Sequence, residues 1–447
     1  MKQLLILLVL IVAPAIYGQE WAKPFEDWAN ENYPADGPGA TVLVAKDGEV
    51  LYRKAFGLAN LELQVPMVPD NVLEIGSMTK QFTSVSILML MEQGKLSLKD
   101  PITKFLPDYP THENVITVHN LLNHTSGIKS YTAMRPFFEK ARTDMSPKEI
   151  IDFFKDEPMD FQTNDAYRYN NSGYIILGYI IEEVSGMSYA EFVDKNIFQP
   201  LGMSHSYYGS KTKLIPNRAL GYQPTREGGY QNAAYLSMTL PYAGGSLMSN
   251  VDDLLIWQQA LHNNTLIKQS SKELAFTNGT LNNGDHIDYG YGFSVNEISD
   301  VPSIEHGGGI FGYECYATYV PSEDLYAVVL TNRNGNGPID ATVRLTALAM
   351  GKPYPQADQG VSLSQGQLEK WVGSYTFPDG AVRHITMDQG KLFSQREGSR
   401  VFELVPLSEN EFAFIDSLAR YTFAEAEGTK QAEFKSRIKK SLGAISN

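Results

Sequence analysis

A helical segment that is apolar on nearly every side follows Ser77. Between Lys80 and Gly94, apolar residues fall on every side of the helix they would form, namely Phe82, Val85, Ile87, Leu88, Met89, Leu90 and Met91. A helix that is apolar all round is buried inside a domain rather than laid on its surface. The pattern therefore predicts a central buried helix that begins near Ser77 and ends at Gly94.

Shorter β-branched and apolar segments predict an antiparallel sheet. Thr41 to Ala45 and Val50 to Tyr52 flank the tight-turn pair Asp47-Gly48, which is typical of a hairpin. Tyr313 to Val320 and Leu325 to Thr331 predict a second hairpin much later in the chain. Strands are therefore expected at both ends of the same region.

Helical periodicity returns between the two hairpins. It runs from Ile175 to Gly186 and again from Val251 to Leu261. Residues 205–245 are rich in Tyr, Gly, Asn and Pro and predict a long ordered excursion over the surface. Long loops of this kind often shape access to a substrate site.

The two ends of the chain differ from its middle in composition and in residue pattern. Residues 1–18 carry one positive charge and a short apolar run that ends in small residues, which predicts a secretory signal peptide cleaved after Gly18. Residues 351–365 are rich in Pro, Gln, Ser and Gly and predict a linker. Short alternating segments between Trp371 and Phe414 predict that residues 366–447 form a small all-β domain, either a barrel or a sandwich.

The composition narrows the classes of partner. The chain has 447 residues, a formal net charge of -14 and a single cysteine, Cys315, which we interpret as a small buried residue. One cysteine excludes an internal disulfide. An acidic chain without a basic run argues against nucleic acid and against anionic lipid surfaces. No metal-ligand spacing or phosphate loop is present, so no metal or cofactor is expected.

Ser77 and Lys80 are candidates for a nucleophile and its proton acceptor. On a helix they would stand on one face, and burial favours the neutral amine that a lysine base requires. The same spacing occurs in three other contexts: Ser126/Lys129 in a turn, Ser210/Lys213 in a polar loop and Ser436/Lys439 in a basic C-terminal tail. On spacing alone, a capping or first-turn serine is the more common explanation, but only Ser77 opens a long buried helix.

Other candidate groups lie in loops and near strands. Tyr169 and Asn171 fall in a loop directly before a helix, where side chains can face a cleft or, for Asn171, cap the helix. The run Gly307-Gly308-Gly309 follows His306, and it indicates either a close approach to a strand or a flexible loop. His124 could be catalytic or could bond nearby backbone as a structural residue.

Taken in order, these groups resemble the three motifs of the serine penicillin-recognising enzymes. The match is to the class C β-lactamase and DD-peptidase branch, whose motifs are Ser-x-x-Lys, Tyr-x-Asn and Lys/His-Thr/Gly-Gly. Flanking blocks also resemble that family, namely residues 76–83, 121–127 and 200–203, and the resemblance covers roughly residues 30–345. The C-terminal segment is similar to an accessory β domain that some members carry.

The resemblance implies the fold and the division of the chain. It implies an α+β hydrolase domain over residues 19–350, with a central antiparallel sheet flanked by helices and an all-helical region beside it. Residues 366–447 would form the accessory domain. The resemblance further implies that Ser77 is the nucleophile and that Lys80 and Tyr169 relay its proton, without deciding which of them is the acylation base.

The resemblance also assigns the surrounding groups. Asn171 would hold Lys80 and the substrate, and the glycines after His306 would line the substrate, with Gly309 as the second oxyanion donor beside Ser77. His306 stands where the familiar motif has lysine, and it is largely neutral at pH 7 unless its pKa is raised. Weaker selection for a free carboxylate is therefore expected.

Three functions remain open at this point. An exported serine hydrolase of D-amino-acid peptides, amides or small esters, located in the periplasm or secreted, fits the residues best. A β-lactamase and a non-catalytic penicillin-binding-like protein are the alternatives. The expected partner is a small-molecule or peptide substrate, with no membrane span in the mature chain.

Overall fold

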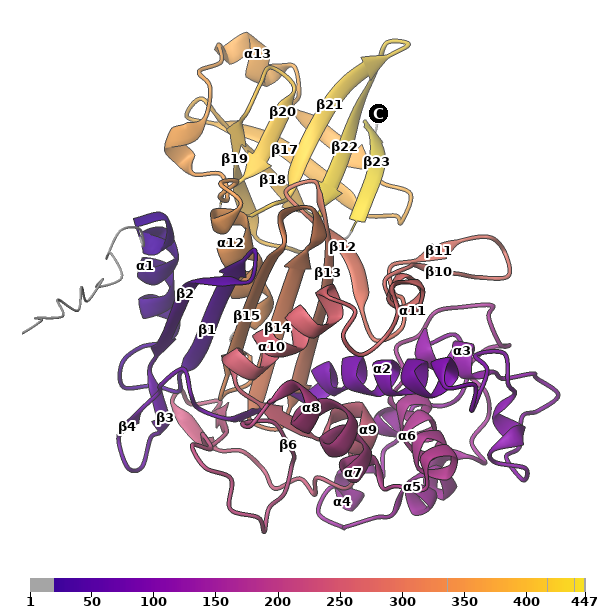
Figure 1. Cartoon of the computed structure of the whole chain (residues 1–447). Coiled ribbons are helices and arrows are strands. Elements are labelled where there is room, and N and C mark those ends of the chain that lie inside the picture. The colour runs from indigo at the N-terminus through magenta and orange to yellow at the C-terminus, as the bar shows by residue number, and fades with distance from the viewer. Residues whose placement is uncertain (1–19, 336, 416, 438, 446–447) are drawn as a thin grey trace, which may run out of the picture.

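The computed structural model describes residues 20–335, 337–415, 417–437 and 439–445 (Figure 1). The predicted signal peptide, residues 1–18, lies outside the described residues. Within the described ranges, no helix is both long and apolar enough to cross a membrane.

A six-stranded antiparallel sheet forms the centre of the first domain. Its strand order is β12-β13-β14-β15-β1-β2. The bounds are β12 (Ser294–Ile298), β13 (Val301–Ile310), β14 (Tyr313–Val320), β15 (Leu325–Thr331), β1 (Ala40–Lys46) and β2 (Glu49–Phe56). Both predicted hairpins are confirmed, and β1 pairs with β15, so the two hairpins join into one sheet.

Alternate residues of the sheet pack into two separate hydrophobic cores, because successive side chains of a strand point to opposite faces. Val42 and Val329 pack on one face with α1 (Lys23–Asn32) and α12 (Pro338–Ala349). Leu43 and Val328 pack on the other face with the large core of the helical region. The sheet is therefore covered on both faces, as the resemblance implies.

The helical region lies beside the sheet (Figure 1) and surrounds the central helix α2. Helix α2 runs over Thr79–Glu92, and most of its residues are buried. Ser77 itself lies just ahead of it, in a 3₁₀ turn over Gly76–Met78. The other helices are α3 (Val118–Leu122), α4 (Phe137–Lys140), α5 (Pro147–Phe154), α6 (Asn171–Ser185), α7 (Tyr189–Val193), α8 (Gln199–Leu201), α9 (Tyr242–Gly245), α10 (Val251–His262) and α11 (Gln269–Ala275).

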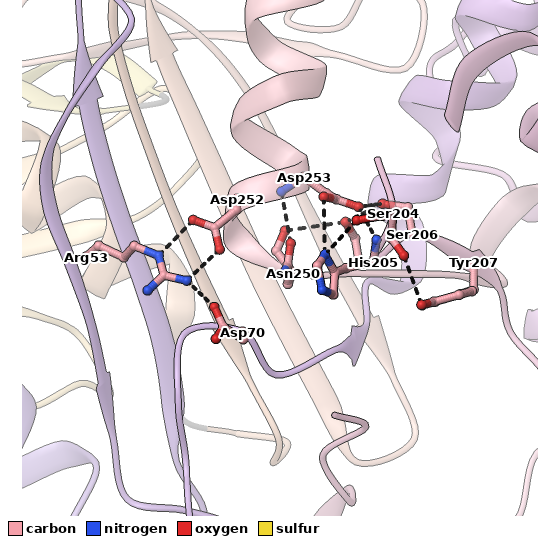
Figure 2. Close-up of polar contacts among 10 residues, drawn as sticks. Arg53, Asp70, Ser204, His205, Ser206, Tyr207, Asn250, Asp252 and Asp253 are labelled. Carbon is pink, nitrogen blue, oxygen red and sulfur yellow. Dashed lines mark hydrogen bonds and ion pairs between the residues drawn. The ribbon is translucent and has the colours of Figure 1, made fainter. Parts of the chain in front are cut away.

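Short strand pairs order the connections between these helices. The predicted excursion over residues 205–245 contains one complete strand pair, one further strand whose partner lies just beyond it, and α9, so it is ordered as expected. The short strands are β3 (Leu58–Asn60) with β4 (Val65–Pro66), β5 (Leu73–Glu74) with β9 (Leu247–Ser249) and β6 (Tyr207–Tyr208), β7 (Tyr222–Pro224) with β8 (Tyr230–Asn232), and β10 (Gly279–Thr280) with β11 (His286–Ile287). Arg53 of β2 also binds Asp252 at the start of α10 through two contacts of 2.7 Å (Figure 2).

The C-terminal domain is a closed eight-stranded antiparallel barrel, which confirms the predicted all-β domain. A short helix, α13 (Gln365–Glu369), precedes it, and aromatic side chains fill its interior. The strands are β16 (Gly373–Thr376), β17 (Val382–Asp388), β18 (Lys391–Arg396), β19 (Val401–Pro406), β20 (Glu411–Phe414), β21 (Arg420–Ala426), β22 (Thr429–Ser436) and β23 (Lys439–Ile445). The basic tail expected around Ser436 was wrong, because this segment pairs as the hairpin β22–β23 and closes the barrel against β16.

Candidate active site

Ser77 and Lys80 meet where the sheet joins the helical region. The turn that holds Ser77 packs against β13 and α9, and Lys80 stands in the first turn of α2. Lys80 Nζ lies 3.1 Å from Ser77 Oγ. The 3₁₀ turn leads directly into the helix, so the three-residue spacing still places both groups on one side.

Lys80 is completely buried and is held by two further oxygen atoms. Its Nζ lies 2.8 Å from Oδ1 of Asn171 and 2.8 Å from the Gly244 carbonyl oxygen. Burial lowers the pKa of Lys80 to about 7. A neutral amine has two hydrogens and one lone pair, and both oxygens accept hydrogens only. The lone pair of the neutral amine is therefore left for the hydroxyl proton of Ser77.

Two adjacent asparagines at the start of α6 have different roles: one caps the helix and the other contacts Lys80. Asn170 is the capping residue, since its side chain accepts a hydrogen bond from the Gly173 amide at 2.9 Å. Asn171 is thereby free to face Lys80, and its Nδ2 donates to Thr132 Oγ1 at 3.0 Å. The interpretation of Asn171 as the cap was wrong, because its neighbour takes that role. Thr132 fixes which end of the Asn171 amide faces the lysine.

Tyr169 lies beside Ser77 and Lys80 and lines the larger cavity. The centre of its ring is 4.9 Å from Lys80 Nζ, and its hydroxyl interacts with Ser77. Burial raises the pKa of Tyr169 above its usual range, and the hydrogen bond with Ser77 opposes this rise. The side chain is 37% exposed, so water in the cleft moderates the effect. The phenol is therefore protonated at neutral pH.

His124 stands behind Tyr169 and does not reach Ser77 in any contact of the described chain. Its ring centre lies 4.4 Å from that of Tyr169, and its Nδ1 accepts the Asn170 amide at 3.1 Å. Burial keeps its pKa well below the ordinary value, so the ring is neutral. The structural interpretation of His124 fits this arrangement.

His306 lies on β13 at the other side of the cleft. Its Nδ1 is 2.6 Å from the Gly307 carbonyl oxygen, which can only accept, so Nδ1 carries the hydrogen. Its Nε2 then accepts from the Tyr289 hydroxyl at 2.9 Å. Burial, with Lys80 nearby, lowers the pKa of His306 to about 3. The imidazole is therefore neutral at pH 7.

The glycines after His306 are part of β13, so the flexible-loop interpretation was wrong. Strand β12 pairs only as far as Glu305, which leaves the edge of residues 306–310 open beyond that point. A Cβ on Gly308 would lie 1.9 Å from the Ile75 carbonyl oxygen, whereas a Cβ on Gly309 would meet nothing within 4 Å. Glycine thus lets the backbone before Ser77 pack directly on the strand.

Gly308→Ala is expected to destabilise the domain by about 2–3 kcal/mol, because backbone atoms rather than a flexible side chain would have to move. The melting temperature should fall by about 3–4 °C. Gly309→Ala is the matched control and should melt within about 1 °C of the wild type. Equal melting temperatures for the two variants, measured by scanning calorimetry, would contradict the close approach.

Two cavities share Ser77 in their lining. One has a volume of about 360 Å³ and is lined by Tyr131, Phe137 and Phe311 together with Asn171. The other has a volume of about 470 Å³, and its lining includes Tyr289, Tyr316, His306 and Glu314. Ser77 and Gly309 line both cavities. One cavity can therefore take the acyl group and the other the leaving group of a substrate at the same nucleophile.

A second group of serine, histidine and aspartate lies on another part of the domain (Figure 2). Ser204 Oγ and Asp253 Oδ1 both approach Nδ1 of His205, at 3.2 and 3.8 Å. A catalytic relay needs the hydroxyl and the carboxylate on opposite ring nitrogens. Asp253 also accepts the His205 amide at 2.7 Å and the Ser206 hydroxyl at 2.8 Å, so it anchors the segment before β6 to α10.

The structure brings the sequence-predicted site residues to one cleft: Ser77, Lys80, Tyr169, Asn171, His306, Gly307, Gly308 and Gly309. Sequence reasoning missed Thr132, the Gly244 carbonyl and Tyr289, which orient these groups. No local motif signals a carbonyl oxygen or a lone tyrosine. Among the described residues, no three His, Cys, Asp or Glu side chains are grouped to hold a metal ion.

The sheet, the helical region and the position of the Ser77 cleft between them define the β-lactamase/transpeptidase fold class. The family model Beta-lactamase matches residues 30–350, and the chain belongs to this family. This confirms the resemblance inferred from the motifs.

Individual relatives extend the match beyond the first domain. The chain is 30% identical to Penicillin-binding protein 4* of Bacillus subtilis (strain 168), over 85% of this chain and 88% of that protein. It is 28% identical to the D-aminopeptidase of Gluconobacter oxydans (strain 621H), over 75% of this chain and 64% of that protein. The octameric penicillin-binding protein homologue from Pyrococcus abyssi has a similar structure, with a TM-score of 0.66 and 27% identity over 94% of this chain and 99% of that one.

Proposed function

We propose that this protein is an exported serine hydrolase that forms an acyl-enzyme on Ser77. The observation that carries the proposal is the environment of Lys80. Burial lowers its pKa to about 7, which favours the neutral amine. Two carbonyl oxygens accept the hydrogens of this amine, so its lone pair faces the Ser77 hydroxyl. Ser77 is thereby activated by an adjacent base.

The arrangement supports a specific order of proton transfers. Ser77 Oγ attacks a substrate carbonyl while its proton moves to the neutral amine of Lys80. The backbone N–H groups of Ser77 and Gly309 bind the developing oxyanion. The leaving group takes a proton from the Tyr169 phenol, which Lys80 then reprotonates. Water attacks the acyl-enzyme by the reverse sequence and restores the free serine.

This assignment predicts how the rate depends on pH. The value of kcat/KM should rise as the pH increases through about 7 and level off above about pH 8, because Lys80 must be deprotonated to accept the serine proton. A substrate without titratable groups isolates this effect. A steady-state profile that is flat or falling between pH 5.5 and 8.5 would contradict Lys80 as the base.

The second cavity indicates what kind of leaving group fits. Its wall combines the neutral imidazole of His306 with the carboxyl side chain of Glu314. A substrate with a terminal carboxylate would meet a like charge there and would gain no cation from His306. The aromatic lining of the first cavity suits an apolar acyl side chain. With D-aminopeptidase among the relatives, we propose D-amino-acid amides, D-peptides and small esters as substrates.

A panel of p-nitroanilides tests this proposal, with D-alanyl and D-phenylalanyl compounds set against their L enantiomers. D-selective hydrolysis is expected. For a matched pair of leaving groups, amide and free carboxylate, Glu314→Gln should shift kcat/KM towards the carboxylate about fivefold. Glu425→Gln on the barrel is the control and should leave the ratio unchanged. An unchanged ratio in Glu314→Gln would contradict the role of that carboxylate.

β-Lactam hydrolysis is the second candidate, and the match to the family model Beta-lactamase favours it. The lifetime of a penicillin adduct on Ser77 separates the two, because a lactamase releases its adduct rapidly and a peptidase holds it.

Export rests on residues 1–18 and is tested by locating the protein and sequencing its N-terminus, which should begin at Gln19.

A further inference from the structure

Glu305 is a buried carboxylate within the active-site strand. It lies on β13 directly before His306, and its side chain is 0% exposed. Ser303 Oγ donates to its Oε1 at 2.6 Å. Asn296 Nδ2 and the Tyr316 hydroxyl donate to its Oε2 at 3.0 and 2.6 Å. These donors are neutral, and a buried carboxylate also requires a positive partner.

That positive charge comes from the other domain. Arg437 directly follows β22 of the barrel, pairs with Oε2 of Glu305 and is 16% exposed. Its Nη2 lies 3.4 Å from the Tyr316 hydroxyl, and its Cζ lies 5.8 Å from the centre of that ring. Burial disfavours the charge of Arg437, but Glu305 and Tyr316 outweigh this effect and raise its pKa. A charge of the barrel is thus placed inside the hydrolase domain.

The same contacts continue to the cleft. Tyr316 pairs with Gly307 across β13 and β14, and a Cβ on Gly307 would lie 2.6 Å from Cδ2 of Tyr316. The Tyr316 ring therefore covers the strand two residues before Gly309. Tyr316 also lines the larger cavity together with Ser77, and it packs in an apolar cluster that Leu418 of the barrel contacts. A displacement of Glu305 or Tyr316 would therefore also displace β13, the strand that borders Ser77.

Other ion pairs between the described parts of the two domains involve exposed carboxylates. Arg420 and Lys435 of the barrel bind Asp300 in the turn between β12 and β13, and Lys435 also binds Glu297 at 2.9 Å. Both of these carboxylates are 46% exposed. Exposed pairs contribute little, whereas removing one partner of a buried pair leaves an uncompensated charge. These contacts provide matched controls, since Lys435 lies only two residues from Arg437.

We propose that the barrel is a working part of the catalytic unit, in which Arg437 acts as a positioning residue that holds the active-site strand through Glu305 and Tyr316. The proposal rests on the proposed Ser77 hydrolase. Loss of Arg437 should act mainly on the step in which the oxyanion forms, because the Gly309 N–H lies on this strand and an oxyanion donor acts in the transition state.

Steady-state kinetics on the full chain test the proposal. Arg437→Met should lower kcat about 10–100-fold while KM changes less than threefold. Glu305→Gln in the Arg437→Met background should restore kcat to within about fivefold of the wild type, because the neutral amide needs no counter-charge. Lys435→Met, the matched control, should stay within twofold. An unchanged kcat in Arg437→Met, or a loss that Lys435→Met shares and Glu305→Gln does not repair, would overturn the proposal.

Hydrogen–deuterium exchange separates this proposal from the proposed function, since it requires no substrate. Arg437→Met should speed amide exchange in residues 304–310, and the added Glu305→Gln should slow it again. Unaltered exchange in Arg437→Met would overturn the positioning role even if Ser77 is the nucleophile. If the exchange behaves as expected while the wild type hydrolyses none of the panel, the proposed function fails and the coupling of barrel to strand stands.

Discussion

Ser77→Ala is expected to lower kcat/KM by about 10⁴-fold or more, since it removes the atom that forms the acyl bond. The Ser77 backbone N–H remains, and so does the open edge of β13. Substrate binding should therefore persist while turnover is lost. Steady-state kinetics with the preferred p-nitroanilide measure the change.

Ser204→Ala is the control for that experiment. Ser204 also lies beside a histidine and an aspartate, but both of these groups approach one ring nitrogen, which is unsuited to activating a hydroxyl (Figure 2). Its kcat/KM should remain within about twofold of the wild type. If Ser77→Ala kept more than about a tenth of the activity, the reaction would belong to another nucleophile.

Lys80→Met should reduce kcat/KM by about 10³-fold, because a thioether of similar length accepts no proton. Lys213→Met is the matched control, since Lys213 also follows a serine by three residues, Ser210, but lies in an exposed loop. That variant should keep full activity. Equal activity in Lys80→Met and wild type would contradict Lys80 as the base.

The buried lysine also leaves a signature in stability. Its pKa is about 7 in the folded chain and close to 10.4 in an unfolded one, so the unfolded state binds more protons between these values. This group therefore makes the free energy of unfolding rise with pH from about 7 to about 10. The rise should be smaller in Lys80→Met by this contribution, which denaturant titrations at several pH values will measure.

Much of the fold could be predicted because local signals and tertiary structure agree. Asp47-Gly48 marks a hairpin, and the apolar helix after Ser77 is the centre of the domain. The glycine run after His306 could not be assigned as a strand, because glycine has poor strand propensity and the reason for it lies elsewhere, in the Ile75 carbonyl. The strands after residue 420 were missed for the same kind of reason, since charged residues on their outer face resemble a tail.

The reactive groups of the site could be predicted from the sequence, but the residues that position them could not. Ser77, Lys80 and Tyr169 carry recognisable chemistry in a recognisable order. Asn170 and Asn171 could not be told apart, because either amide can cap a helix and only the fold decides which one does. The contact of Glu305 with Arg437 joins residues 132 positions apart in two domains, and no sequence period connects them.

In the proposed reaction Ser77 carries the acyl group, and intact-protein mass spectrometry followed by peptide mapping can locate that group. A fluorophosphonate should add one equivalent to the wild type, located on the peptide that contains Ser77, and none to Ser77→Ala. Labelling of Ser77→Ala at the same rate as the wild type would contradict Ser77 as the nucleophile.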